Sequence, residues 1–214
     1  SGSVTQGNAI TLDAGQGSLS TENAQIVARD TFSAATSGTL DNNGGLLAAD
    51  QLTLSAKRLQ NQKGQISQSG TRALTLTHQD GIDNREGVIA ANATVNVNAA
   101  SLDNRKGQVV AADTGTLTIK TAGLMDNREG EMAAADSLSV TANRLDNSGG
   151  FIGAEQGRVG LTSSKALMNA GGTIAARDTL TLDSAGLNND EGLIQSGADT
   201  IVDTHGNSIS NRDN

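Results

Sequence analysis

The stretch Leu102-Asp103-Asn104-Arg105-Lys106-Gly107-Gln108-Val109-Val110-Ala111 decides the fold, because most of the 214-residue chain repeats it. Written as Leu-x-Asn-x-x-Gly-x-Ile, with any aliphatic residue accepted at either end, the pattern occurs eight times in full between Leu40 and Ile194. Its asparagines are Asn42, Asn61, Asn84, Asn104, Asn127, Asn147, Asn169 and Asn189, and Asn211 begins a ninth copy. Its glycines are Gly45, Gly64, Gly87, Gly107, Gly130, Gly150, Gly172 and Gly192. Self-similarity at a nearly fixed period is typical of a solenoid.

A second element follows each copy of the motif, in which two aliphatic residues are separated by one polar or small residue. These pairs are Leu52/Leu54, Leu74/Leu76, Val95/Val97, Leu117/Ile119, Leu138/Val140, Val159/Leu161 and Leu180/Leu182, and the last copy departs with Ile201 and Asp203. Such alternation predicts a strand with one buried face. A helix is excluded, because Gly or Asn interrupts the sequence about every ten residues.

The repeat unit is too short to bury its own aliphatic side chains, but a stack of identical units buries them against each other. Successive asparagines are 19 to 23 residues apart, so we expect an all-β solenoid of about ten parallel coils of that length. Asparagine both donates and accepts hydrogen bonds, which suits a ladder of side chains running from coil to coil. The motif glycine is predicted to occupy a left-handed position in a tight turn. We prefer this structural role for the asparagines to metal or substrate binding by the column.

The intervals between asparagines alternate between short and long. One insertion precedes the second strand, at Ser69-Gly70, Thr114-Gly115, Gln156-Gly157 and Ser196-Gly197. A single-residue insertion precedes the next motif, as near Gly81, Gly123 and Gly206. The alternation predicts bulged turns on every second coil, about 9.6 Å apart, which is twice the strand separation.

Two regions of one solenoid are expected. Residues 1–39 form degenerate coils, with Thr21 where asparagine is expected and with Phe32-Ser33-Ala34 as a separate strand. Residues 40–214 form the regular repeats and end within a repeat, which predicts a segment cut from a longer filament.

Composition limits the functions that the chain can have. It contains two Phe, no Tyr, no Trp and no Cys, so aromatic sugar platforms are scarce and thiolate chemistry is excluded. The net charge of −8 lacks the basic surface that nucleic acid needs, and no apolar run is long enough for membrane insertion. We expect a monomer without cofactor or metal.

Few residues could carry chemistry. His78 and His205, with Asp80 and Asp203 nearby, could form a metal site or a general base, but solvated turn histidines are the simpler interpretation. An outward column of threonines, as in ice-binding solenoids, is explained equally well by β-propensity. Its members are Thr53, Thr75, Thr118 and Thr181. We therefore expect no enzyme, and a polysaccharide-active β-helix is the least favoured alternative.

The motif Leu-Asp-Asn-x-x-Gly-x-Ile with a following Leu-x-Leu strand resembles the haemagglutinin repeats of two-partner-secretion exoproteins. This class includes filamentous haemagglutinin-type adhesins and contact-dependent growth-inhibition toxin-delivery proteins. The resemblance covers residues 40–194 well. It implies a right-handed parallel β-helix, export by an outer-membrane transporter as partner, and a secreted or cell-surface location.

The expected function is that of a rigid filamentous shaft that carries binding or toxic modules away from the cell. The alternative is a module that binds a host or neighbouring-cell receptor or glycan through the bulged turns on alternate coils. Both interpretations share one fold, so the sequence leaves the choice open.

Overall fold

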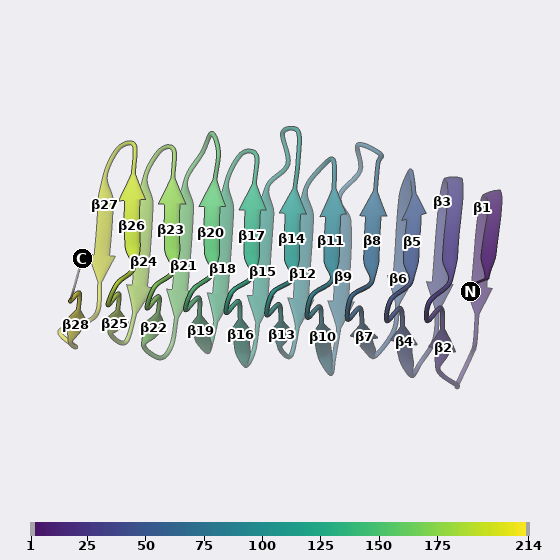
Figure 1. Ribbon diagram of the computed structural model, residues 1–214, viewed down its shortest axis with the longest axis horizontal. Coiled ribbons are helices and arrows are strands. Elements are labelled where there is room, and N and C mark those ends of the chain that lie inside the picture. The colour runs from purple at the N-terminus through teal and green to yellow at the C-terminus, as the bar shows by residue number, and fades with distance from the viewer. Residues whose placement is uncertain (1–2, 213–214) are drawn as a thin grey trace.

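The computed structural model describes residues 3–212, and over this range the chain is an all-β solenoid. About ten coils stack along one long axis, with their strands running across it, and the amino-terminal coil lies at the opposite end from the carboxy-terminal one (Figure 1). The strands of successive coils pair in parallel. The predicted all-β parallel solenoid is therefore confirmed. Each regular coil contributes three strands, which form three faces.

The first face is a sheet of ten short strands, here called the short-strand sheet, which lies along the lower edge in Figure 1. It consists of β2 (Leu19–Ser20), β4 (Thr39–Asp41), β7 (Arg58–Gln60), β10 (Gly81–Asp83), β13 (Leu102–Asp103), β16 (Leu124–Asp126), β19 (Arg144–Asp146), β22 (Leu167–Met168), β25 (Leu187–Asn188) and β28 (Ile209–Ser210). The first aliphatic residue of each motif points inward from these strands, as Leu59 and Leu102 do.

The second face, here called the isoleucine face, follows the motif glycine. It consists of β5 (Leu46–Ala49), β8 (Gln65–Gln68), β11 (Val88–Ala91), β14 (Gln108–Ala111), β17 (Glu131–Ala134), β20 (Phe151–Ala154), β23 (Thr173–Ala176) and β26 (Leu193–Ser196). The second motif aliphatic points inward here. Val109 pairs in register with Ile89 on one side and Met132 on the other, and all three are fully buried. Each such side chain contributes about 1.5–3 kcal/mol by leaving water.

The third face, here called the threonine face, contains the alternating strands. It consists of β6 (Gln51–Ser55), β9 (Leu74–His78), β12 (Val95–Ala99), β15 (Leu117–Thr121), β18 (Leu138–Ala142), β21 (Val159–Ser163), β24 (Leu180–Ser184) and β27 (Thr200–Asp203). The predicted aliphatic pairs are buried. The last copy was aligned wrongly, because Ile201 pairs with the outward Thr181 and Val202 with the inward Leu182.

The first coils differ from the regular ones. β1 (Val4–Asp13) and β3 (Gln25–Ala35) each run without a break over two faces, so Phe32-Ser33-Ala34 belongs to a longer strand and is not a separate one. These long strands pair with each other in parallel through most of their length.

The loops between the isoleucine and threonine faces vary in length. Residues 69–73, 112–116 and 155–158 form longer loops than residues 92–94, 135–137 and 177–179. The alternation therefore holds for three of the four predicted insertions. Residues 197–199, at the fourth insertion, form a loop no longer than its neighbour. Among the described residues, no helix has the length and hydropathy needed to cross a membrane.

Candidate functional site

The asparagines of the motif form a continuous line of side-chain hydrogen bonds inside the solenoid. In each of the eight links the Nδ2 atom of one asparagine donates to the Oδ1 atom of the next coil's asparagine at 2.7 Å. The line runs from Asn42 to Asn211, and we call it the asparagine ladder. At its amino-terminal end the Thr21 hydroxyl donates to Asn42 Oδ1 at 2.9 Å. Threonine therefore occupies the asparagine position there and continues the line.

The second amide hydrogen of each asparagine is also used. Asn104 Nδ2 donates to the Gly107 carbonyl at 3.2 Å, within its own turn, and approaches the Glu131 carbonyl at 3.1 Å in the next coil. The side chains from Asn42 to Asn169 are fully buried. A buried amide whose donors and acceptor are already paired offers nothing to a metal ion or a substrate. The geometry thus supports a structural role for the column.

The left-handed conformation lies one residue earlier in the turn than predicted. Lys63, Glu86, Lys106 and Glu129 have φ between 55° and 57°, whereas the motif glycines that follow them do not have positive φ. The prediction for the motif glycines was therefore wrong in its physical reason. Glycine is needed because the turn of one coil presses against the asparagine of the previous coil. A Cβ atom on Gly130 would meet the Asn104 carbonyl oxygen and the Asn127 side chain closer than 3.0 Å.

An aspartate before the asparagine closes the same turn. Asp103 Oδ1 accepts a hydrogen bond from the Arg105 backbone N–H at 3.3 Å, and Asp126 does the same for Arg128 at 3.2 Å. Such an Asx turn fixes the chain where it leaves the short-strand sheet. Sequence reasoning gave no role to this residue. The signal was present, since aspartate recurs at this position, for example at Asp41 and Asp146.

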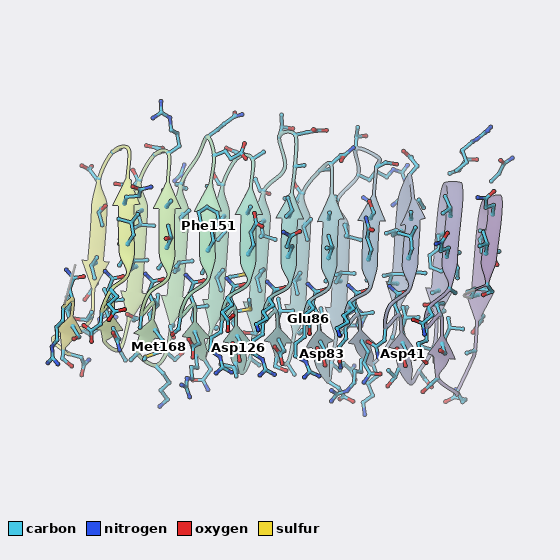
Figure 2. All side chains as sticks on the ribbon, in the orientation of Figure 1. Asp41, Asp83, Glu86, Asp126, Phe151 and Met168 are labelled. Atoms are coloured by element: carbon cyan, nitrogen blue, oxygen red, sulfur yellow. The ribbon has the colours of Figure 1, made fainter. Side chains whose placement is uncertain are left out.

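Three aspartates at this position, Asp83, Asp103 and Asp126, also form an ion-pair row with the arginines two residues later. Arg105 binds Asp103 at 2.7 Å and approaches Asp126 of the next coil at 3.6 Å. Arg128 binds Asp126 at 2.7 Å. Asp41, Asp83 and Asp126 lie in one row along the lower edge of the solenoid (Figure 2). The arginines therefore prevent repulsion between carboxylates that stack only about 4.8 Å apart.

The ion pairs shift the pKa values of several residues in this row. Burial raises the pKa of Asp126, but the hydrogen bonds and the charge of Arg128 outweigh burial and leave this pKa below its ordinary value. The pKa of Asp83 is lowered in the same way, with Arg85 opposing the effect of burial. The hydrogen bond and charge of Asp103 raise the pKa of Arg105. The lowered pKa values keep Asp83 and Asp126 ionised at neutral pH, so their pairs with Arg85 and Arg128 are ion pairs there.

His78 is not a solvated turn residue, because it ends β9 and its side chain is buried. Its Nδ1 atom lies 2.9 Å from the Ala56 carbonyl, and within residues 3–212 its Nε2 atom is buried without a hydrogen-bond partner. Burial lowers the pKa of His78, and the hydrogen bond with Ala56 opposes this only in part. Asp80 pairs with Lys57 at 3.5 Å and not with His78. A buried histidine without a carboxylate partner cannot act as a base toward a dissolved substrate.

His205 is exposed, as predicted, and contacts two carboxylates. Its Nε2 atom lies 2.7 Å from Asp183, and its Nδ1 atom lies 3.6 Å from Asp203. The hydrogen bond with Asp183 and the charges of Asp203 and Asp183 raise the pKa of His205. β27, which leads into His205, is separated from β9 by five strands of the threonine face (Figure 1). The two histidines therefore do not meet in one site.

Other candidate sites are equally dispersed. Thr75 and Thr118 point outward on either side of Asn96, in register, and Gly160 interrupts the column further along. Over the described part of the chain, no group of three or more His, Asp or Glu side chains is placed to hold a metal ion.

Comparisons with known proteins agree with this geometry. The family model for the haemagglutinin repeat matches residues 14–86, 73–129 and 133–213. A curated protein named "Toxin CdiA", from Yersinia pestis, is 33% identical over 87 residues, which cover 41% of this chain and 3% of that protein. The chain thus spans a small fraction of the relative that it matches. No solved structure matches. Since the repeat model matches nearly the whole chain, the protein belongs to the haemagglutinin-repeat family.

Proposed function

We propose that these coils form a rigid shaft segment of a secreted bacterial adhesin or contact-dependent toxin-delivery protein. The observation that carries this proposal is the unbroken stacking of the coils. Eight asparagine links and three parallel faces continue in register through the described chain. A rod in which every coil bonds to both neighbours is stiff and keeps its two ends at a fixed distance, which is the property that a spacer needs.

Family membership supports the cellular context of the proposal. The match to part of a CdiA toxin favours export through an outer-membrane two-partner-secretion transporter and residence on or beyond the cell surface. The proposed role requires no catalysis by this segment. The segment acts as a monomer, and its contribution is reach and stiffness.

A swap of equal-length segments tests the spacer role in the longer secreted protein proposed as its context. Replacing residues 62–104 by a second copy of residues 105–147 keeps two coils and the asparagine register but changes many outward side chains. A spacer predicts unchanged secretion and unchanged activity of the modules that it carries. Loss of cell binding, with secretion and folding intact, would show that residues 62–104 recognise a partner.

The longer loops favour a second candidate, a receptor- or glycan-binding module. Residues 69–73, 112–116 and 155–158 project from one edge of the solenoid, between the isoleucine and threonine faces (Figure 1). Shortening these three loops to the length of residues 92–94 tests the candidate. Loss of saturable cell binding would favour recognition by the loops, and unchanged binding would leave them as connections.

A further inference from the structure

A surface groove crosses four coils at the boundary between the motif turns and the isoleucine face. Its volume is about 580 Å³. Its lining comes from the turn residues Lys106, Glu129, Gly149 and Gly171, the motif glycines Gly107, Gly130 and Gly150, and the first outward residues of β14, β17, β20 and β23. The groove therefore runs along the axis of the solenoid and not along a strand.

The groove opens because two turn side chains are missing. The left-handed turn position carries Lys63, Glu86, Lys106 and Glu129 in four successive coils, but it is glycine at Gly149 and Gly171. A Cβ atom on Gly171 would meet nothing within 4 Å, and on Gly149 it would only touch the Glu129 side chain at 3.6 Å. The missing side chains leave a floor of backbone beside β20 and β23.

Phe151 forms the wall of this groove. It is 38% exposed, whereas Phe32, the other aromatic residue of the chain, is buried. Its ring lies over Gly153, because a Cβ atom added there would contact ring atoms of Phe151. Figure 2 shows Phe151 on the outer side of β20. One ring face thus rests on the sheet, and the side chain offers an exposed aromatic surface in a chain with almost no others.

Polar side chains stand next to the ring. Glu131, which pairs in register with Phe151, accepts a hydrogen bond from Gln108 Nε2 at 3.0 Å. Lys106 pairs with Glu129 at 3.5 Å. The groove thus combines an aromatic surface with amide and carboxylate groups, and its three charged side chains sum to −1.

We infer that this groove binds a neutral, β-linked oligosaccharide. The CH face of a pyranose ring packs on an aromatic ring, while neighbouring hydroxyls bond to amide and carboxylate groups. Coils are about 4.8 Å apart, slightly less than the rise of one sugar residue in an extended β-linked chain, so successive sugars would lie over successive coils across the four coils of the groove. The acidic balance disfavours sulfated or uronic glycans, since the whole chain carries −8.

A basic peptide fits the groove less well. The charged side chains of the groove sum to only −1, and Lys106 places a cation at one end, so a row of basic side chains gains little from it. The strands that form the floor are paired on both sides, as β20 is with β17 and β23. An extended peptide therefore finds no strand edge to extend. A saccharide needs none, because its contacts are made by hydroxyls and CH groups.

Two independent variants and two matched controls test the inference. Phe151→Thr removes the ring and installs the residue found at Thr173, while Leu193→Thr makes a similar apolar loss at the same register position outside the groove. Gly149→Gln fills the groove with an uncharged side chain, while Gly149→Ala alters the same backbone and leaves the groove open. Thermal melting checks that each variant folds.

Titration calorimetry of the purified 214-residue chain uses tetramers of N-acetylglucosamine and of β-linked glucose, a heparin tetrasaccharide and hexa-arginine as probes. We expect saturable binding of a neutral tetramer, weakened at least about tenfold by Phe151→Thr and by Gly149→Gln, and changed less than about twofold by the controls. Absence of saturable binding by both neutral tetramers, or binding that the groove variants leave unchanged, would overturn the inference. So would a groove-dependent preference for heparin or hexa-arginine. None of these outcomes bears on the spacer role, which the segment swap tests separately.

Discussion

Asn104 lies directly under Asn127 and donates a 2.7 Å hydrogen bond from its Nδ2 atom to the Asn127 Oδ1 atom. Asn84 makes the same bond to Asn104 from the other side. The side chain is therefore a link whose loss leaves a buried acceptor on Asn127 and a buried donor on Asn84.

Asn104→Ala tests the contribution of this link to stability. We expect the free energy of unfolding to fall by about 2–4 kcal/mol, because two neighbouring amides lose partners inside the protein. Asn98→Ala, at an exposed position of β12, is the control and should change it by less than about 0.5 kcal/mol. Urea unfolding measures the free energy of unfolding of both variants. Equal losses would show that the asparagine ladder does not contribute to stability.

Gly130→Ala tests the close approach of successive turns. A Cβ atom at this position meets the Asn104 carbonyl oxygen, so we expect a loss of about 3 kcal/mol as the coils are forced apart. Gly171→Ala is the contrasting variant. It has φ of 62° and open space around its Cα, so only the cost of the left-handed conformation remains, about 1 kcal/mol. A larger loss for Gly171→Ala, measured by the same unfolding assay, would contradict the steric explanation.

Two arginines of the ion-pair row, Arg105 and Arg128, should differ in their contribution to stability. Arg128→Ala leaves Asp126, whose side chain is only 6% exposed, with the more distant Arg105 as its remaining partner. We expect a loss of about 1–2 kcal/mol, reduced from the value for a fully buried pair because Arg128 itself is half exposed. Arg105→Ala leaves Asp103 at the surface and should cost less than about 1 kcal/mol. Thermal melting that ranks them in the reverse order would show that burial of the aspartate does not decide the effect.

His78 predicts a loss of stability in acid. Its pKa is lowered in the folded protein by burial, so the unfolded chain binds the proton more readily. Its contribution is therefore present above the unfolded pKa of about 6.5 and decreases as the pH falls below it. His78→Ala should flatten the dependence of unfolding free energy on pH between about pH 7 and pH 5.

His205 supplies the control for that experiment, because its folded pKa is raised by Asp183 and Asp203. Its contribution is present below the unfolded pKa and is lost as the pH rises through the folded value. His205→Gln should therefore steepen the acid loss, opposite to His78→Ala. If the two variants change the slope in the same direction, the assignment of the buried histidine is wrong.

The regular spacing of asparagine, glycine and aliphatic residues was enough to predict the parallel solenoid, because stacking of like residues is the one arrangement that buries them all. The burial of His78 was missed because polar neighbours suggested a turn, whereas its position continues the inward series of β9 and is followed in register by Ala99. The sequence analysis placed the left-handed conformation at the motif glycine, but it belongs to the residue before it. Glycine is required by a contact with the previous coil, and a single repeat does not reveal such a contact. The groove beside Phe151 depends on two glycines in neighbouring coils, and only the stacked arrangement brings them together.

The stacking itself is tested most directly by removing two coils and measuring the length of the molecule. Deleting residues 62–104 joins Asn61 to Arg105 and preserves the motif across the junction. Small-angle X-ray scattering should then give a maximum dimension shorter by about 10 Å, with an unchanged cross-section, because each coil adds about 4.8 Å. An unchanged length with a thinner cross-section, or a compact particle, would contradict the account of stacked coils.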